Sequence, residues 1–572
     1  MDWYFCKFVS TTTKFLLGGC LVCFTAAGAG AQTPSPTPVE PRPLPSRVAQ
    51  DAPPTAPDFS QPIRPLPSAG RVGVETANQL SLTLSQAVEL ALRNNNDIDA
   101  SRNTARISDL DLLGARGVYD PLLVAEGYYE RLTTPTASAI GGAVNGAVTQ
   151  SRFFGTSGVS GFSPRYGGQY SATFNNSRTT SSNTNSFLNP QFPTSLVATY
   201  TQPLFRNLRI DNNRRQIEIA KRNINLTDAQ LRLRAVEVIS SVEQAYWDLV
   251  FALRNLQVQS ETLLQARERL ESNKRLVGAG VLAPIELVAA NSQIYTFEQN
   301  VFAAQEAITR AENVLKMLML PDRSSTEWSQ ALIPVTPTVA DGPRIGLEIA
   351  LAEALKNRPE LAQLDATAEI NRIEQRFFRD QTRPQIDIVS SITSQGLSGS
   401  QTPAAISPTT GLSRVPPNLV GGLLSSLGNL LAFDYPSYRV GLAISLPFGN
   451  RIAKANFGRT LVDADRIANT RAQVEQLIEA EVRNALQALR SVESRLESAV
   501  AARFAAEELY ASEERLFRGG TSTFFLVAQR QTELATARGR ELQARTDLNK
   551  AISEFQRSIG RTLSVNNVSV TK

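Results

Sequence analysis

Apolar residues recur every seven positions over 242–277 and 287–315 of this chain, and two long stretches, roughly 214–277 and 451–518, contain no proline. The positions three further on are often alanine. Such a repeat is typical of long helices that pack side by side. At 1.5 Å per residue, each of the two longest helices is predicted to span about 95–100 Å. The repeating residues in the first half of the chain are Val242, Leu249, Leu256, Leu263, Leu270 and Val277, then Leu287, Ile294, Val301, Ile308 and Leu315.

Glycine-containing segments follow both long helices. Glycine is favoured just after a helix, and proline or serine where the next helix starts. Each long helix is therefore predicted to turn back as an antiparallel hairpin, over 214–320 and 451–559. Helix capping alone accounts for these residues, and a role as exposed tips that contact a partner is an equal alternative. The residues concerned are Gly278, Gly280 and Pro284 in the first turn and Gly519, Gly520 and Ser522 in the second.

The folded part of the chain is an internal duplication. The segment 84–98 resembles 347–361 at an offset of 263, and Pro121 matches Pro384 at the same offset. Pro203 matches Pro447 at an offset of 244, so the first half carries 19 more residues between its two prolines. We expect two repeats, 82–336 and 337–563. Each repeat begins with a helix, over 84–116 in the first and 347–381 in the second.

Short runs that alternate between apolar and polar residues predict strands between the helices of each repeat, within 118–205 and 384–449. Val440, Leu442 and Ile444 alternate with smaller or polar residues, and the stretch 123–130 alternates in the same way. Two strands are expected per repeat. The segments 132–195 and 392–437 are rich in Ser, Thr, Asn, Gly and Pro, which favours exposed loops. Aromatic residues in and after the first of these segments leave further strands open: Tyr166, Tyr170, Phe174 and Tyr200.

The two ends of the chain differ from the repeats. Residues 1–31 are predicted to be a signal peptide, with an apolar run over 15–27 and the cleavage pattern Ala29-Gly30-Ala31. The alternatives are a membrane-spanning helix, for which the run is short, and lipidation at Cys20. Residues 32–70 hold 12 of the 31 prolines, so 32–81 is predicted to be an extended linker. Residues 564–572 form a tail.

Composition excludes several classes of function. The chain has no histidine, and its three cysteines are Cys6, Cys20 and Cys23, all in the expected signal peptide. The mature chain would therefore lack Ser-His and Cys-His pairs and the common zinc sites, and we expect no cofactor, no metal and no enzyme activity. The net charge of +5 is spread along mixed-sign helices, which does not favour nucleic acid. The acid pairs 507–508 and 513–514 lie in a charged helical stretch, where a solvated face is the simpler interpretation than general acid–base catalysis.

Four strands per chain cannot stand alone in a membrane, because an open sheet leaves unpaired backbone groups facing lipid. Single-chain barrels need at least about eight strands. We therefore expect assembly, and three copies would supply twelve strands.

Several runs, in this order and duplicated, resemble the TolC-like outer-membrane efflux proteins over about residues 82–563. The runs are Leu84–Asn94, Gln202–Phe205 and Ser445–Gly449 at strand ends, Ala245–Leu249 at the entry of the first long helix, and the two turns with their flanks, 275–287 and 515–527.

The resemblance implies a mainly α fold with a membrane β-barrel, in which three copies form a twelve-stranded barrel on a tube of long antiparallel helices. It implies an outer-membrane channel of a Gram-negative-type bacterium that extends into the periplasm. The channel would serve as a passive exit duct for a tripartite efflux or type I secretion system. The implied partners are a periplasmic adaptor and an inner-membrane pump of the RND, ABC or MFS type.

The resemblance also implies that the two turns form the gate and adaptor contact, with aspartates just after the second turn. This chain has Leu526 and Gln529 there, and an acid at Glu286 after the first turn. Three copies of Glu286 would form an acidic ring, whereas favourable placement in the first turn of a helix is the simpler interpretation. The alternative function is a periplasmic coiled-coil adaptor, which leaves the strands unexplained. The sequence does not identify the cargo.

Overall fold

The computed structural model describes residues 71–137, 139–143, 145–338 and 342–570. The predicted signal peptide, Cys20 and most of the predicted linker lie outside these residues. Among the described helices, none has an apolar stretch long enough to cross a membrane.

Two long helices dominate the structure, as the seven-residue repeat predicts. Helix α3 spans Asn212–Gly278 and α8 spans Arg451–Arg518. Each folds back into a shorter antiparallel partner, α4 (Ile285–Met319) and α9 (Phe524–Ser558). The repeat residues form the buried seam of the first hairpin, where Leu263 and Leu315 are completely buried. Burial of this stripe stabilises both helices, because isolated helices gain little from propensity alone.

The first helix of each repeat was expected to be continuous, and this prediction was wrong. The first is broken into α1 (Leu84–Asn94) and α2 (Asn96–Arg116), and the second into α5 (Leu347–Asn357) and α6 (Pro359–Gln381). Asn95 has extended backbone angles and its side chain caps α2. Pro359 opens α6 and disfavours a helical conformation at Arg358, which is also extended.

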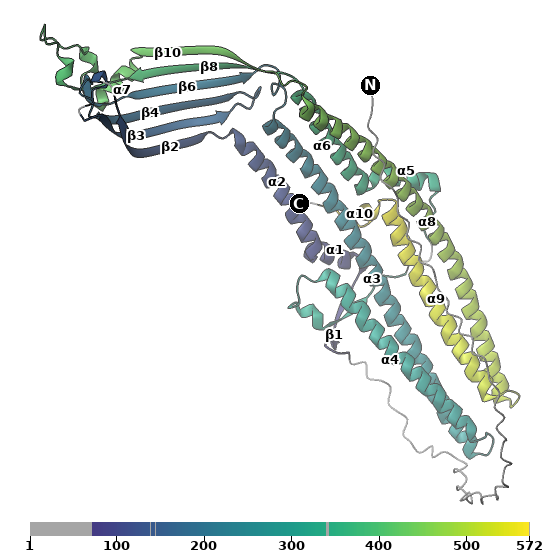
Figure 1. The fold of residues 1–572 in the computed structure, drawn as a ribbon. Helices are drawn as coiled ribbons and strands as arrows, with labels where there is room; N and C mark the ends of the chain where they lie inside the picture. The colour runs from purple at the N-terminus through teal and green to yellow at the C-terminus, as the bar shows by residue number, and fades with distance from the viewer. Residues whose placement is uncertain (1–70, 138, 144, 339–341, 571–572) are drawn as a thin grey trace, which may run out of the picture. The chain divides into compact units, whose positions relative to one another are not determined.

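The helices form a layer four helices wide at each level. Near the sheet, α2 packs on α3, α3 on α6, and α6 on α8; further away, α4 packs on α3, α3 on α9, and α9 on α8. Helices α2 and α4 thus follow each other along one side of α3, and α6 and α9 follow each other between α3 and α8 (Figure 1). Unbroken helices therefore alternate across the layer with pairs of shorter helices.

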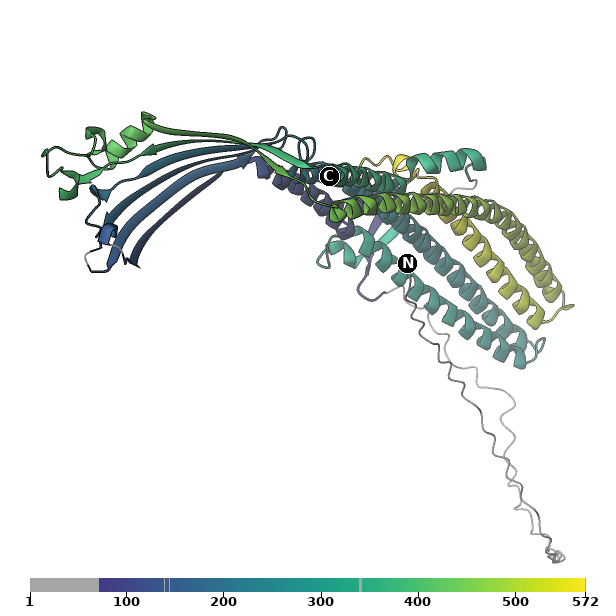
Figure 2. The ribbon, with the colours of Figure 1, turned by 45° about the horizontal axis from the view of Figure 1, so that its top comes forward.

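The main sheet contains six long antiparallel strands in the order β10-β8-β6-β4-β3-β2. Figures 1 and 2 show it at the end of the helical layer away from the hairpin turns. The prediction of two strands per repeat was therefore wrong for the first repeat, which contributes four long strands, and right for the second repeat, which contributes two. The strands are β2 (Leu122–Pro135), β3 (Ala147–Phe162), β4 (Gln169–Ser181), β6 (Thr194–Pro203), β8 (Gln385–Gly396) and β10 (Tyr435–Ser445).

The longer segment of the first repeat thus forms additional strands rather than a longer loop. Most of 132–195 is strand, with Tyr170 and Phe174 in β4, so the loop prediction was wrong there. In the second repeat, the segment between β8 and β10 is mostly irregular. Short elements near the far end of the sheet are β5 (Leu188–Gln191), β9 (Gly399–Gln401) and helix α7 (Leu423–Leu431), which packs on β6 and β8.

A small parallel sheet lies beside the helices and corrects both ends of the predicted domain plan. Strand β1 (Glu75–Leu82) pairs with β7 (Gln330–Pro334), so the linker prediction was wrong from residue 75 onward. Leu82 and Leu332 belong to the largest buried cluster. At the other end, α10 (Thr562–Val565) is followed by Val568 and Val570, which pack against the same cluster instead of trailing free.

Candidate functional site

The first hairpin turn is built by glycine, as predicted. Helix α3 ends at Gly278, and Gly280 has a φ of 73°, which suits a residue without a side chain. The amide of Gly280 donates to the Val277 carbonyl at 2.9 Å, and that of Val281 to the Leu276 carbonyl at 2.9 Å. These bonds satisfy carbonyl groups that the end of the helix leaves free. Pro284 stands immediately before α4.

The second turn uses the same device with one correction. Gly519 follows the end of α8, and Gly520 has a φ of 75°. Thr523, not Ser522, caps α9, because its side chain accepts a hydrogen bond from the Leu526 amide at 3.4 Å. Ser522 instead donates to the carboxylate of Glu513 on α8. A sequence rule that favours either hydroxyl equally cannot separate two adjacent candidates.

The two turns carry exposed apolar side chains that the sequence analysis did not single out. Val281 and Ile285 are 73% and 67% exposed in the first turn, and Phe525 is 70% exposed in the second. Leu526 and Gln529 are also exposed, and Gln529 donates to Glu533 at 3.0 Å. Glu286 lies in the first turn of α4 and is half-buried. The nine predicted tip residues thus lie in or beside two turns at the same end of the layer (Figure 1). The same turns carry the exposed apolar side chains of Val281, Ile285 and Phe525.

A polar link joins the two hairpins above these turns. Arg269 on α3 donates to the Tyr510 hydroxyl on α8 at 2.5 Å and lies 3.5 Å from the carboxylate of Glu514. Burial raises the pKa of Tyr510. Gln293 on α4 also donates to the Ala528 carbonyl on α9 at 3.1 Å. Near their turns the two hairpins are thus linked by polar contacts, in addition to the packing of α9 on α3.

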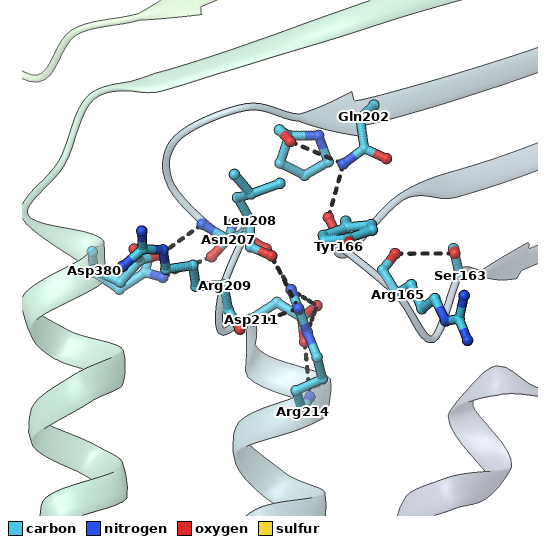
Figure 3. Close-up of polar contacts among 12 residues, drawn as sticks. Ser163, Arg165, Tyr166, Gln202, Asn207, Leu208, Arg209, Asp211, Arg214 and Asp380 are labelled. Carbon is cyan, nitrogen blue, oxygen red and sulfur yellow. Dashed lines mark hydrogen bonds and ion pairs between the residues drawn. The ribbon is translucent and has the colours of Figure 1, made fainter.

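The passage from sheet to helix is fixed by one arginine. Arg214, in the first turn of α3, donates to the carbonyls of Asn207, Leu208 and Arg209 at 2.6, 3.0 and 3.1 Å (Figure 3). Its backbone amide donates to Asp211, which caps α3, at 2.8 Å. Three carbonyls gathered by one guanidinium hold the chain rigidly where it leaves β6.

Two further contacts tie this junction to its neighbours. The Asn207 amide donates to Asp380 at the end of α6 at 2.7 Å, and Asn207 has a φ of 66°. Gln202 at the end of β6 donates to the Tyr166 carbonyl in the turn between β3 and β4 at 2.9 Å (Figure 3). The sheet and the helical layer are therefore joined as one wall rather than through a loose loop.

The register of the sheet gives it two different faces. Directly opposite residues share a face, and neighbours along a strand alternate between faces. One face is mainly aromatic and aliphatic: Leu123 and Tyr129 on β2, Phe153 and Val159 on β3, Phe174 on β4, Leu196 and Tyr200 on β6, Ile388 and Ile392 on β8, and Tyr438, Val440, Leu442 and Ile444 on β10.

The opposite face is mostly Ser, Thr, Asn and Gln and carries five of the seven charged strand residues, namely Glu126, Glu130, Arg152, Asp387 and Arg439. The other two, Arg131 and Arg178, lie toward the far end of the sheet on the apolar face. Tyr128 and Phe154 stack on the polar face, with ring centroids 4.9 Å apart. The sheet thus separates an apolar environment from a polar one.

Both outer helices of the layer, α4 and α8, carry apolar side chains that are exposed. On α4, Val288, Tyr295 and Phe302 are exposed at seven-residue spacing. On α8, the exposed apolar residues include Leu477 and Phe504. A repeated apolar stripe on a helix normally faces another helix, so the stripe on α4 suits packing against a further helix at that edge of the layer.

Of the acids considered in the sequence analysis, Glu507 and Glu514 form ion pairs and Glu513 accepts a hydrogen bond from Ser522. Hydrogen bonds from Arg538 and Arg503 hold the pKa of Glu507 below its usual range, which is opposite to what a general acid requires. Within the described ranges, no group of three or more His, Cys, Asp or Glu side chains is placed to hold a metal ion.

Comparison with known proteins identifies the fold. The chain matches the outer membrane efflux protein family over residues 166–319 and 350–561. A search of curated proteins finds no match.

Solved structures of outer-membrane channels have the same fold at low sequence identity. CusC aligns with a TM-score of 0.60 and 15% identity, covering 88% of this chain and 99% of its own. CmeC of Campylobacter jejuni gives 0.59 and 14%, with 89% and 95% covered, and OprN gives 0.58 and 17%, with 88% and 98% covered. These structures are described as an outer-membrane channel (OprN, CmeC) or in terms of transmembrane channel formation (CusC).

Proposed function

Because this chain belongs to the outer membrane efflux protein family, we propose that it is one of three identical subunits of an outer-membrane channel. The channel is a passive duct. Its strands cross the outer membrane and its helices extend the duct through the periplasm. Energy for transport comes from a separate pump. The chain has no catalytic role in this account.

The observation that carries this proposal is an incomplete wall with two different faces. The sheet has an apolar and a polar face, which suits a boundary between lipid and a water-filled lumen. The sheet has two open edges, and both outer helices of the layer carry exposed apolar residues, in a repeated stripe on α4. Further copies of the same chain supply what is missing on every edge at once. A periplasmic adaptor would need neither the long strands nor their apolar face.

The hairpin turns are the proposed gate and adaptor contact. The exposed apolar residues Val281, Ile285 and Phe525 offer a surface for a periplasmic adaptor, and an inner-membrane pump of the RND, ABC or MFS type completes the pathway. Efflux and type I secretion both use such a duct, and the cargo is chosen by the pump. The turn residues assigned to this role are Gly278, Gly280, Pro284, Glu286, Gly519, Gly520, Ser522, Leu526 and Gln529.

Membrane extraction and conductance test the proposal together. We expect the protein to resist salt extraction, to leave the outer membrane only on solubilisation, and to form discrete conducting pores in planar bilayers. Release by salt alone, with no conductance, would support a peripheral adaptor instead.

A ring of three Glu286 carboxylates would favour cations at the entrance. We therefore expect Glu286→Gln to lower cation selectivity, measured as the reversal potential in a salt gradient. An unchanged reversal potential removes the acidic ring and leaves Glu286 as a first-turn helix residue.

A further inference from the structure

Both edge strands of the main sheet are exposed along their whole length. All fourteen residues of β2 and all eleven of β10 are exposed, whereas the four strands between them are paired on both sides. An unpaired backbone group in lipid costs several kcal/mol, so strands of this length must find partners. We propose that β2 of one copy pairs with β10 of the next, so that each copy contributes six strands and three copies close an eighteen-stranded barrel. The number of copies rests on the proposed function.

The strand directions allow this closure. Six strands joined antiparallel in one sheet leave its two edges running in opposite directions. Strand β2 leads away from α2 and β10 leads toward α8, so β2 of one copy meets β10 of the next as an antiparallel pair. The chain therefore supplies the even number of strands that an all-antiparallel barrel needs.

The strand lengths fix the register to two possibilities. Following directly opposite residues across the sheet leads from Arg439 on β10 to Leu122 on β2. If every residue of β10 is to have a partner on β2 with the faces preserved, Arg439 must lie opposite Tyr128 or Glu130. Tyr128 and Glu130 lie six and eight residues beyond Leu122, so the pairing shifts by six or eight residues for every six strands. This shift corresponds to a strand tilt of about 35–43°, which agrees with the tilt of closed barrels. Full pairing and barrel geometry thus give the same answer.

The charges at the two edges are complementary. On the polar face, β2 carries Glu126 and Glu130 and β10 carries Arg439. Within the described parts of one chain, none of these three forms an ion pair or a side-chain hydrogen bond. Either register places Arg439 directly opposite Glu130 or diagonally between the two glutamates, an arrangement that favours cross-strand pairing.

A twelve-stranded barrel would need β4, rather than β2, as the edge strand of each copy. The family match covers β4, β6, β8 and β10, and begins after β3. Four strands per copy would give twelve, with β10 paired to β4 of the next copy. That edge is already occupied, because β4 is bonded to β3 over thirteen residue pairs and to β6 on its other side.

The width of the helical layer also fits six strands. Six strands about 4.8 Å apart, tilted by about 40°, occupy about 38 Å of circumference. Four helices spaced about 9–10 Å apart occupy about 36–40 Å. The ring of strands and the ring of helices therefore have nearly equal circumference. The junction at Arg214 can connect them without a change in diameter.

Disulfide trapping in the native outer membrane tests the pairing, since the only natural cysteines are at positions 6, 20 and 23. Gly127→Cys is combined with Val440→Cys for the Tyr128 register and with Leu442→Cys for the Glu130 register. A Cβ at Gly127 meets only an ordinary contact at 3.7 Å. We expect one of these double variants to give covalent dimers and trimers on non-reducing gels. Gly127→Cys with Gly441→Cys, on opposite faces, is the matched control and should stay monomeric.

Ala125→Cys with Leu442→Cys or Ile444→Cys repeats the test one pair away, in case Gly127→Cys does not assemble. Ala172→Cys with Leu442→Cys or Ile444→Cys reports the β4 alternative. Trapping of a β4 pair, or trimers that an amine-reactive cross-linker captures while no β2 pair forms a disulfide, overturns the eighteen-stranded barrel and leaves the channel proposal standing. Absence of trimers by every method overturns both.

Discussion

The most deeply buried charges of the structure hold the small parallel sheet on the helices. Lys316 on α4 is fully buried and donates to the Trp328 and Gln330 carbonyls at 2.8 and 2.6 Å. It also pairs with Glu312 at 2.9 Å, which pairs in turn with Arg71. A buried ion pair adds little net stability, but loss of Lys316 leaves buried carbonyl groups without their donor.

Lys316→Met should therefore destabilise the protein by about 3–5 kcal/mol, because it leaves the buried Trp328 and Gln330 carbonyls without a donor and removes one partner of Glu312. The matched control is Arg310→Ala, which breaks the exposed pair with Glu306 on the same helix and should cost no more than about 0.5 kcal/mol. Thermal unfolding in detergent measures both. Equal effects of the two substitutions would contradict a structural role for the buried cluster.

Glu243 provides a pH-dependent test at the same scale. Burial raises its pKa, and hydrogen bonds from Asn566 and Ser553 only partly oppose this. A carboxyl group whose pKa is raised on folding stabilises the fold below its unfolded pKa, and this contribution is lost as pH rises through the folded pKa. Glu243→Gln keeps the acceptor for Asn566 and removes the buried charge.

The unfolding temperature of Glu243→Gln relative to wild type should therefore rise as pH increases from about 4 to 7. The exposed Glu261 on the same helix supplies the control, Glu261→Gln. If the difference in unfolding temperature between Glu243→Gln and wild type does not change with pH, folding does not shift the pKa of Glu243.

The elements show which patterns in the sequence are informative. The long helices were predicted nearly to the residue, because an apolar repeat of seven over 242–277 within a proline-free stretch fits no other regular structure. Strand β3 was assigned to loop and β4 was left open, because the polar face of a two-faced sheet is rich in Ser, Thr and Asn, as loops are. Strand β1 was missed because its partner β7 lies far away in the sequence and the pairing leaves no local signal.

The hairpin turns allow two glycines to be tested against each other. Gly280 has a φ of 73°, so Gly280→Ala should destabilise the protein by about 1–2 kcal/mol even though its Cβ would meet nothing within 4 Å. Gly278 ends α3 without such a backbone angle, and Gly278→Ala should stabilise by up to about 1 kcal/mol. Denaturant unfolding checks the signs. Two effects of the same sign would contradict the assigned turn conformation.

The polar link between the hairpins is expected to restrain opening of the tips. Tyr510→Phe removes the hydroxyl that accepts from Arg269 and keeps the aromatic ring. Loss of a hydrogen bond to a charged group weakens the link by about 1.5 kcal/mol, so the open probability in single-channel recordings should rise by up to about tenfold. The control is Arg538→Ala, which breaks a pair with Glu507 inside one hairpin. An unchanged open probability in Tyr510→Phe would separate this contact from gating.

At the scale of the whole molecule, both the main sheet and the helical layer have free edges that a neighbouring copy in a ring would cover. The sheet ends in two exposed strands, and the outer helices α4 and α8 of the helical layer carry exposed apolar residues. The internal duplication and the family resemblance could be recognised from sequence, and the family match confirms the latter. The number of strands per copy could not, because it depends on which backbone edges remain free.

The mass of the detergent-solubilised particle tests the central claim most directly. Native mass spectrometry of the mature protein should give three times the mass of one chain, since only a closed ring covers both edges of each copy. A particle with the mass of a single chain, stable over a range of detergents, would contradict the account.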